Sequence, residues 1–137
     1  VGGIEYTGII EMTAQGIGQI AGNNMAFALG IVLWMSAFLS SAIDNVPFAA
    51  TMAPLIKDLS VITGLELNPI AWSLSLGTDI GGNGTPIGAS ANVVGVAVAE
   101  KNRYPINWGT YCKVAYPSMV VSIAVCYAIL LLRYVVL

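Results

Sequence analysis

Asp44 and Asn45 are the residues whose types and position best suit the binding of a small ion. They follow a long apolar run and come directly before Val46-Pro47. A carboxylate at membrane depth costs about 2.5 to 3.5 kcal/mol on insertion scales and typically marks an ion or proton pathway. Because a cation and a proton compete for one carboxylate, such a residue can couple their movements. The alternative is that Asp44 is an interfacial acid that ends an ordinary membrane span.

A second polar segment, residues 77–88, contains five glycines and one proline inside an otherwise apolar region. A regular helix through it would lose roughly 1 kcal/mol per glycine and about 3 kcal/mol for the proline. The sequence therefore predicts that a helix is unwound here. Carbonyl groups left free at the end of the first half-helix suit a cation, and free N–H groups at the start of the second favour an anion. The alternative is a glycine-lined crossing between two helices.

The candidate ion-binding residues of these segments combine carboxylates, amides, hydroxyls and closely approachable backbone. They are Asp44, Asn45, Thr51, Asp79, Gly81, Gly82, Asn83, Gly84, Thr85, Gly88, Ser90 and Asn92. Asp44, Asn45 and Thr85 are the candidates for a transient Na⁺ site. Asp79 either faces the same cavity as Asp44 or is a helix-end acid at the outer surface. We expect no resident metal or cofactor, since the chain has no histidine and its two cysteines lack a metal-ligand spacing.

The composition places both polar segments in a membrane. Of the 137 residues, 57% are hydrophobic and only 9% are charged, whereas a soluble domain carries about 25% charged residues. Residues 12–43, 80–99 and 114–132 carry no charge, and each run reaches the roughly 18 to 20 residues that cross a bilayer. Because the runs are continuously apolar, the predicted class is an all-α membrane protein. A net charge of −2 provides no basic surface for nucleic acid.

Four elements are expected to position the polar segments. They are an amphipathic helix at the membrane interface (1–23), a re-entrant helical hairpin (24–58) with its tip near 44–47, a broken transmembrane helix (69–100) unwound at about 77–91, and a final transmembrane helix (114–137).

The boundaries of these elements follow from local signals. Pro47 disfavours helical geometry at the residue before it, and the apolar stretch 48–56 before Lys57-Asp58 is too short to cross a bilayer. A connection is expected over 59–68. The second half of the broken helix is expected to begin near Ser90 or Asn92, since both are common N-cap types. For the N-terminal region, the alternative is the end of a preceding span followed by a polar loop.

The orientation follows from the basic residues Lys101, Arg103 and Lys113, which place the loop 101–113 in the cytoplasm. One final crossing then puts the C-terminus outside, and the hairpin enters from the outer face. The chain starts with Val1 and contains no readable signal peptide, so we expect it to be a piece of a longer protein.

Two motifs resemble the second half of ion transporter superfamily permeases. They are SAFLSSAIDNVPFAATMAP (36–54) and LGTDIGGNGTPIGASANVVGVAVAE (76–100). The sequence is most similar to the melanosomal P protein branch, alongside arsenite permeases, sodium:proton antiporters and citrate-transporter-like domains. The resemblance implies two inverted repeats, each with a re-entrant hairpin and a broken helix, that hold substrate near the midplane. The chain contains one copy of each motif, so an N-terminal repeat of the same protein is an expected partner, as is a second copy in a homodimer.

Departures from these relatives bear on the substrate. Dicarboxylate relatives have a Ser-Asn-Thr tip, whereas this chain has Asp44-Asn45-Val46, and a carboxylate there would repel a dianion. Arsenite permeases tend to have a neutral amide at the position of Asp44. Thr78-Asp79 also differs from the pattern of the P protein branch.

The sequence therefore predicts a secondary active transporter of the cell membrane, not an enzyme, that moves a small ion with Na⁺ or H⁺ coupling by alternating access. An arsenite or carboxylate/citrate-type anion permease of the same superfamily is the first alternative. A passive channel or a non-transporting membrane subunit is the alternative of a different class, and non-saturating conductance would favour it. A self-sufficient small carrier acting as a homodimer is disfavoured by the clear Lys/Arg bias.

Overall fold

The computed structural model describes residues 9–137, and in this range the chain is helical with no strand. The predicted all-α class is confirmed. The elements in chain order are α2 (Ile9–Ala21), α3 (Met25–Ser40), α4 (Asn45–Thr63), α5 (Leu67–Gly81), the 3-10 turn η1 (Gly82–Gly84), α6 (Ser90–Lys101), α7 (Trp108–Leu131) and the π-helical end η2 (Leu132–Val136).

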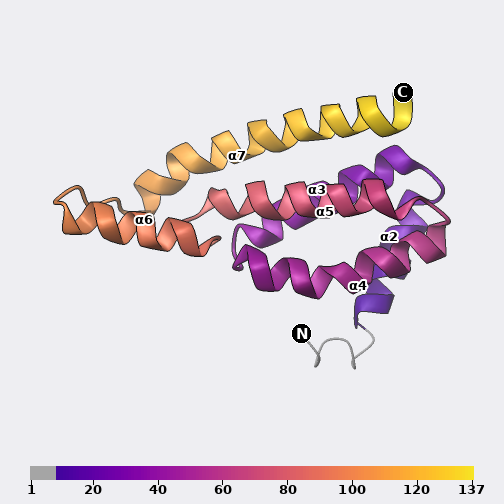
Figure 1. The fold of residues 1–137 in the computed structure, drawn as a ribbon, viewed down its shortest axis with the longest axis horizontal. Coiled ribbons are helices and arrows are strands. Elements are labelled where there is room, and N and C mark those ends of the chain that lie inside the picture. Colours follow the sequence, from indigo (N-terminus) through magenta and orange to yellow (C-terminus); the bar gives the residue numbers. More distant parts are fainter. Residues whose placement is uncertain (1–8) are drawn as a thin grey trace.

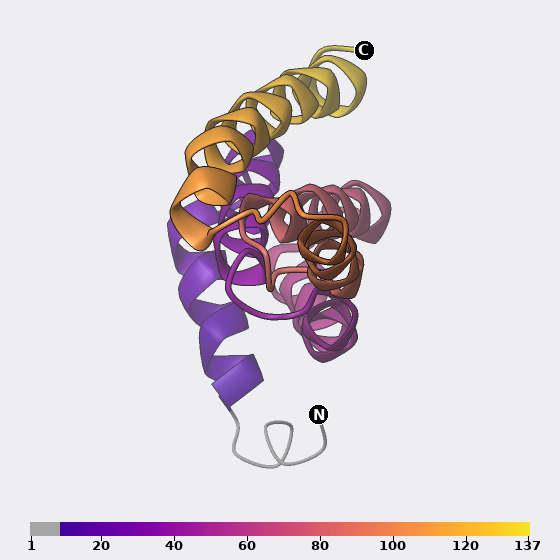
Figure 2. The same ribbon diagram turned by 90° about the vertical axis from the view of Figure 1, so that its left-hand side faces the viewer.

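The long helices lie side by side and bring two non-helical segments to the same level of the bundle. Figure 1 shows α3, α4 and α5 running next to one another, with α7 along them and α6 extending past the turn between α3 and α4. In the end-on view of Figure 2, α6 lies in front of α4 and α5. A hydrogen bond from Thr85 to the Ser41 carbonyl joins the turn at 41–44 to the interruption at 82–89.

Helix α4 is longer than the sequence analysis predicted. The nine-residue apolar stretch before Lys57-Asp58 is by itself too short to cross a membrane, but α4 has 19 residues and continues through both charges. It does so because Lys57 lies on the exposed side while Leu55, Ile56 and Leu59 are buried. By length and composition, α4 is able to span a membrane. The second arm of the hairpin is therefore longer than predicted, and re-entrance of the segment 24–58 stays a prediction.

The connection expected over 59–68 is confined to residues 64–66. Gly64 ends α4 with a φ of 69°, in the left-handed region that glycine adopts without a Cβ penalty. Ser60 Oγ donates a hydrogen bond of 2.6 Å to the Leu65 carbonyl and so closes the turn.

Helix α7 also begins earlier than predicted, at Trp108 rather than at residue 114. The Asn107 side chain caps it by accepting a 2.8 Å hydrogen bond from the Thr110 N–H. Lys113 consequently lies within the helix, on its exposed surface. The connection between α6 and α7 is reduced to residues 102–107.

Helix α2 packs against the bundle through Ala14, Ile17 and Ala21, which are buried. Gln15 and Gln19 are exposed, so the described part of this helix is two-faced. Residues 1–8 of the predicted interfacial helix lie outside the described residues. That this helix lies at a membrane interface stays a prediction.

Helix α3 lies between two apolar clusters. Val32 belongs to a cluster with α2, α4 and α5, and Leu29, Leu33 and Ala37 belong to one with α7. Large apolar side chains nevertheless remain exposed along α6 and α7, among them Val94, Val114 and Val121. Two helices in the described range, α4 and α7 with its π-helical end, are long and apolar enough to cross a membrane. These features are those of an integral membrane protein.

Candidate functional site

Asp44 connects the turn between α3 and α4 to the first residue of α6. Its Oδ1 accepts a hydrogen bond of 3.1 Å from the Val46 N–H, which makes Asp44 the N-cap of α4. Its Oδ2 accepts a hydrogen bond of 2.6 Å from Ser90 Oγ. The acid and the hydroxyl, both predicted site residues, are thus brought together.

Thr85 and Asn92 hold the interrupted backbone in place. Thr85 Oγ1 donates a hydrogen bond to the Ser41 carbonyl and accepts one of 3.2 Å from the Gly88 N–H. Asn92 Nδ2 donates to the carbonyls of Gly82, at 2.9 Å, and of Thr85, at 3.0 Å. Both predicted site residues therefore lie at the interruption, where their polar atoms bind backbone.

The carbonyl groups at the end of α5, expected as cation ligands, also have protein donors. The Thr78 carbonyl accepts a 2.7 Å hydrogen bond from Ser40 Oγ. The Asn83 carbonyl accepts one of 3.2 Å from the Tyr111 hydroxyl of α7. Asn83 Nδ2 itself makes a long contact of 3.5 Å to the Asp79 carbonyl. In this conformation each of these carbonyls accepts a hydrogen bond from a protein side chain.

The glycines allow close approach of backbones. A Cβ on Gly81 would lie 2.5 Å from the Cα of Ala37 in α3, so Gly81 is a helix-crossing residue. A Cβ on Gly82 would lie 2.9 Å from the Gly88 carbonyl oxygen, and one on Gly84 would lie 2.7 Å from Met119 Sδ. The alternative of a glycine-lined helix crossing therefore applies to Gly81. The chain also leaves the helix at residues 82–89.

Asp79 and Asn45 line a separate open depression beside the turn, with a volume of about 350 Å³. Val46, Ala49, Ser75, Leu76 and Thr78 complete its wall. Asp79 is exposed. In the part of the chain that the structure describes, its carboxylate has no hydrogen-bond or ion-pair partner. Asp79 therefore shares this depression with Asn45, and Asp44 is not among the residues that line it.

Thr51 is also a predicted site residue, but its hydrogen bond lies within α4 and does not reach the interruption. Its Oγ1 donates a hydrogen bond of 2.8 Å to the Pro47 carbonyl one turn earlier in α4.

Several residues at the site were missed in the sequence analysis. Ser40, Ser41, Tyr111 and Met119 each contact the end of α5 or the interruption. The spacing of small residues at positions 36, 37, 40 and 41 is a signal for a close helix crossing at the end of α3. No comparable signal points to Tyr111 or Met119, which approach from a helix far along the chain.

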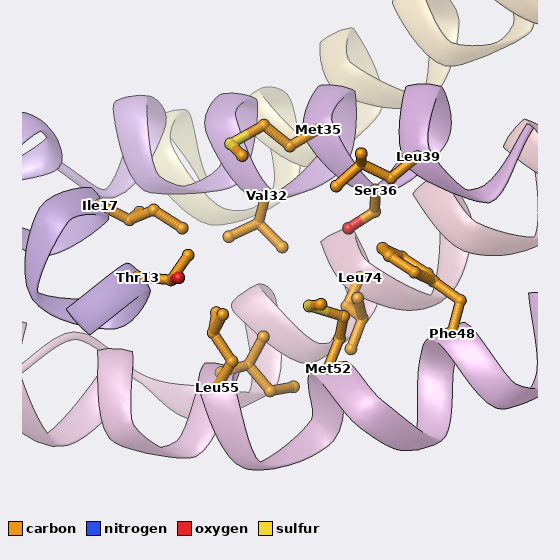
Figure 3. A pocket seen from close by; sticks show the side chains of 11 residues that line it. Thr13, Ile17, Val32, Met35, Ser36, Leu39, Phe48, Met52, Leu55 and Leu74 are labelled. Atoms are coloured by element: carbon orange, nitrogen blue, oxygen red, sulfur yellow. The ribbon is translucent and has the colours of Figure 1, made fainter. Parts of the chain in front are cut away.

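A smaller cavity among α2, α3, α4 and α5 does not resemble an ion site. Its volume is about 60 Å³, and Figure 3 shows apolar side chains around it, with Thr13 and Ser36 as the polar ones. With no acid or amide in its wall, this cavity is part of the apolar interior.

The comparisons with known proteins decide the family. The sequence model described as citrate transporter matches residues 1–77, more than half of the chain. The chain belongs to the citrate transporter family. This agrees with the family resemblance found in the two motifs, which is thereby confirmed.

Relatives match this chain over all or nearly all of its length. The P protein of Sus scrofa is 42% identical over 137 aligned residues, covering 98% of this chain and 16% of that protein. The P protein of Homo sapiens is 42% identical over 136 aligned residues, covering 97% of this chain and 16% of that protein. An uncharacterized transporter of Mycobacterium tuberculosis is 38% identical over 139 aligned residues, covering 100% of this chain and 32% of that protein. The chain thus spans a minor part of each relative. No solved structure matches it.

Proposed function

We propose that the chain is part of a secondary active membrane transporter that moves a small ion, with Na⁺ or H⁺ coupling, by alternating access. The observation that carries this proposal is the meeting of two non-helical segments at Asp44, through an exposed hydrogen bond at one end of a bundle of apolar helices (Figure 1). Broken helices with polar groups at membrane depth are typical of secondary transporters. Membership of the citrate transporter family supports the same class of function.

Asp44 is the proposed point of coupling. It is the N-cap of α4 and accepts a hydrogen bond from the first residue of α6, so the positive ends of two helix dipoles support its negative charge. A proton or a cation that binds the carboxylate weakens it as an acceptor for Ser90 Oγ. Loosening this 2.6 Å hydrogen bond frees α6 from the turn. Ion occupancy and helix position are then linked, as alternating access requires.

The membrane arrangement we propose is that of the sequence analysis. The segment 24–58 forms a re-entrant hairpin that enters from the outer face, and 69–100 crosses once with its break near the hairpin tip. Residues 101–113 are cytoplasmic and the C-terminus is outside, by the positive-inside rule. An N-terminal repeat of the same protein supplies the other half of the pathway, and the whole protein forms a homodimer.

An anion permease is the second candidate function. The family model is described as a citrate transporter, and the N-terminus of α6 begins after Ala89 without a side-chain cap, which suits an anion. The Asp44 carboxylate lies at this same helix start, however, and repels a carboxylate substrate. The arrangement therefore favours a cation or a proton over citrate or a similar anion.

Transport by the full-length protein in proteoliposomes tests the proposal. Uptake of ²²Na⁺ driven by an imposed pH gradient should saturate with Na⁺ concentration and should dissipate the gradient. Non-saturating conductance in planar bilayers would instead identify a channel. Uptake of labelled citrate or arsenite without movement of Na⁺ or H⁺ would establish the anion permease in its place.

A further inference from the structure

We propose that a depression between the beginning of α5 and the end of α7 binds the headgroup of one anionic glycerophospholipid, such as phosphatidylglycerol. The depression has a volume of about 190 Å³ and is lined by Trp72, Leu76, Leu130, Arg133 and Tyr134; we call it the Arg133 depression. The proposal goes beyond the proposed function, because it concerns a lipid bound at the protein surface and does not depend on which ion is transported.

Two helices supply the walls of the Arg133 depression. Trp72 and Leu76 are spaced i and i+4 on α5 and therefore lie on one side of that helix. Leu130, Arg133 and Tyr134 are spaced i, i+3 and i+4 along the end of α7 and η2, so they likewise lie on one side. Figure 1 shows the C-terminal end of α7 at the same end of the bundle as the connection between α4 and α5. The depression thus lies at one end of the apolar helices, where lipid headgroups meet a membrane protein.

Arg133 is the charged group of the Arg133 depression. It follows directly after the uncharged run 114–132 and lies in the last turn of a helix that is long and apolar enough to cross a membrane. An arginine at the end of a span extends its guanidinium into the headgroup layer. The guanidinium carbon lies 5.5 Å from the centre of the Tyr134 ring, and among residues 9–137 the Arg133 side chain has no ion-pair partner. Its positive charge is therefore available to an anion.

The two aromatic residues of the depression supply further donors. Within the described part of the chain, neither Trp72 Nε1–H nor the Tyr134 hydroxyl has a hydrogen-bond partner. Tryptophan and tyrosine are enriched at membrane interfaces, where their polar tips meet the headgroups. A guanidinium binds a phosphate through two parallel hydrogen bonds, and basic pockets between membrane helices bind anionic headgroups. One cation and two neutral donors are thus complementary to a phosphodiester.

The surroundings of Arg133 favour a lipid over a free phosphate. Leu76 and Leu130 form the apolar part of the wall, and the side chains of Ile129 and Leu132 on α7 and η2 are 57% and 55% exposed. The acyl chains of a lipid cover such apolar surface, whereas a free phosphate leaves it uncovered. Among the described residues, no acid lines the depression. The ammonium of a choline headgroup would find no carboxylate there, so the site favours an anionic headgroup.

Quenching of Trp72 fluorescence in the full-length protein tests the site. The protein is reconstituted in phosphatidylcholine vesicles that contain a small fraction of either phosphatidylglycerol or phosphatidylcholine with brominated acyl chains, which quench a tryptophan that they contact. The Trp72 signal is the emission of the wild type minus that of Trp72→Phe. We expect brominated phosphatidylglycerol to quench this signal several-fold more than brominated phosphatidylcholine does.

Three variants separate the guanidinium from general attraction of anionic lipid. Arg133→Gln should weaken the binding of brominated phosphatidylglycerol about tenfold, as the loss of hydrogen bonds between charged groups implies. Arg133→Lys keeps the charge without the planar fork and should retain part of the preference. Lys113→Gln removes an exposed basic residue of the same helix outside the depression and should retain all of it. Because Arg133 is exposed, Arg133→Gln should keep the wild-type Tm in detergent.

The remaining outcomes would overturn the lipid site. Equal quenching of Trp72 by the two brominated lipids in the wild type would show no selective binding. An unchanged preference in Arg133→Gln would show that the guanidinium does not hold the headgroup. Absence of quenching by either lipid would show that another part of the protein covers the depression. Excess glycerol 3-phosphate in the buffer should leave the preference unchanged, and its loss would identify a site for a free phosphate instead of a lipid.

Discussion

The Asp44 carboxylate joins two helix starts across 46 residues of sequence. It caps α4 through Val46 N–H and binds Ser90 at the start of α6. Around it, Thr85 and Asn92 satisfy carbonyls that an unwound segment would otherwise leave without donors. At the scale of single residues, the site is therefore a set of polar side chains that stabilise a helix interruption, with Asp44 as its charged member.

Gly81 should be intolerant of a side chain, because α3 lies directly against it. In Gly81→Ala the new Cβ would be 2.5 Å from the Ala37 Cα, and neither backbone is able to move cheaply. We expect a loss of about 1 to 3 kcal/mol in the free energy of unfolding. The thermal unfolding of the full-length protein in detergent measures it. Gly95→Ala, where a Cβ would meet nothing within 4 Å, is the control and should leave the Tm unchanged or higher.

The stability of the fold should depend on the amide group of Asn92 rather than on the size of its side chain. Asn92→Asp replaces two hydrogen bonds to the Gly82 and Thr85 carbonyls by repulsion between oxygens. The expected loss in the free energy of unfolding is about 1 to 3 kcal/mol. Asn68→Asp, an exposed position in the first turn of α5, receives the same charge near a helix N-terminus and should change little. Equal unfolding temperatures for the two variants would contradict this role of Asn92.

At the scale of elements, the helix interruption could be predicted from the sequence, whereas the contacts that hold it could not. Five glycines and a proline at 77–88 disfavour a regular helix, but Gly77 and Gly81 lie within α5, so the chain leaves the helix only at 82–89 and not from residue 77 as predicted. Ser90 and Asn92 were predicted as N-caps, but both bind partners outside their own helix. Such partners depend on how α3, α5 and α6 pack, which local propensity does not encode.

The extent of α4 was not predictable from charge positions alone. Lys57-Asp58 were interpreted as the end of an apolar segment. A charged residue does not end a helix when its side chain is exposed, as that of Lys57 in α4 is, and its exposure depends on how α4 packs against its neighbours. By contrast, the all-α membrane class follows from composition, which no packing detail changes.

The proposed topology predicts that the two ends of the α5–α6 segment lie on opposite sides of the membrane. Cysteines introduced at Asn102 should react with an impermeant thiol reagent only from the cytoplasmic side, and cysteines at Glu66 only from outside. Both positions are exposed. The assay uses the full-length protein in sealed vesicles of each orientation, with Cys112 and Cys126 replaced. Labelling of both positions from one side would contradict a single crossing by this segment.

At the scale of the whole molecule, the chain corresponds to a small part of its relatives. The chain covers 16% of the P proteins and 32% of the mycobacterial transporter that it matches. Within the described range, α6 contributes no buried side chain although it is largely apolar. Lipid and other parts of the whole protein are the surfaces that such a helix contacts in a membrane. Tests of transport therefore belong to the full-length protein.

The central claim is that Asp44 couples ion occupancy to helix position, and Asp44→Asn tests it most directly. The amide keeps the size of the side chain and removes the charge for which a proton and a cation compete. The measurement is ion uptake by the full-length protein in proteoliposomes as a function of pH. Glu66→Gln, at an exposed loop residue whose side chain makes no cap hydrogen bond, is the control. We predict that Asp44→Asn loses most of the uptake or its pH dependence while Glu66→Gln keeps both. An unchanged rate and an unchanged pH profile in Asp44→Asn would contradict the coupling role of Asp44.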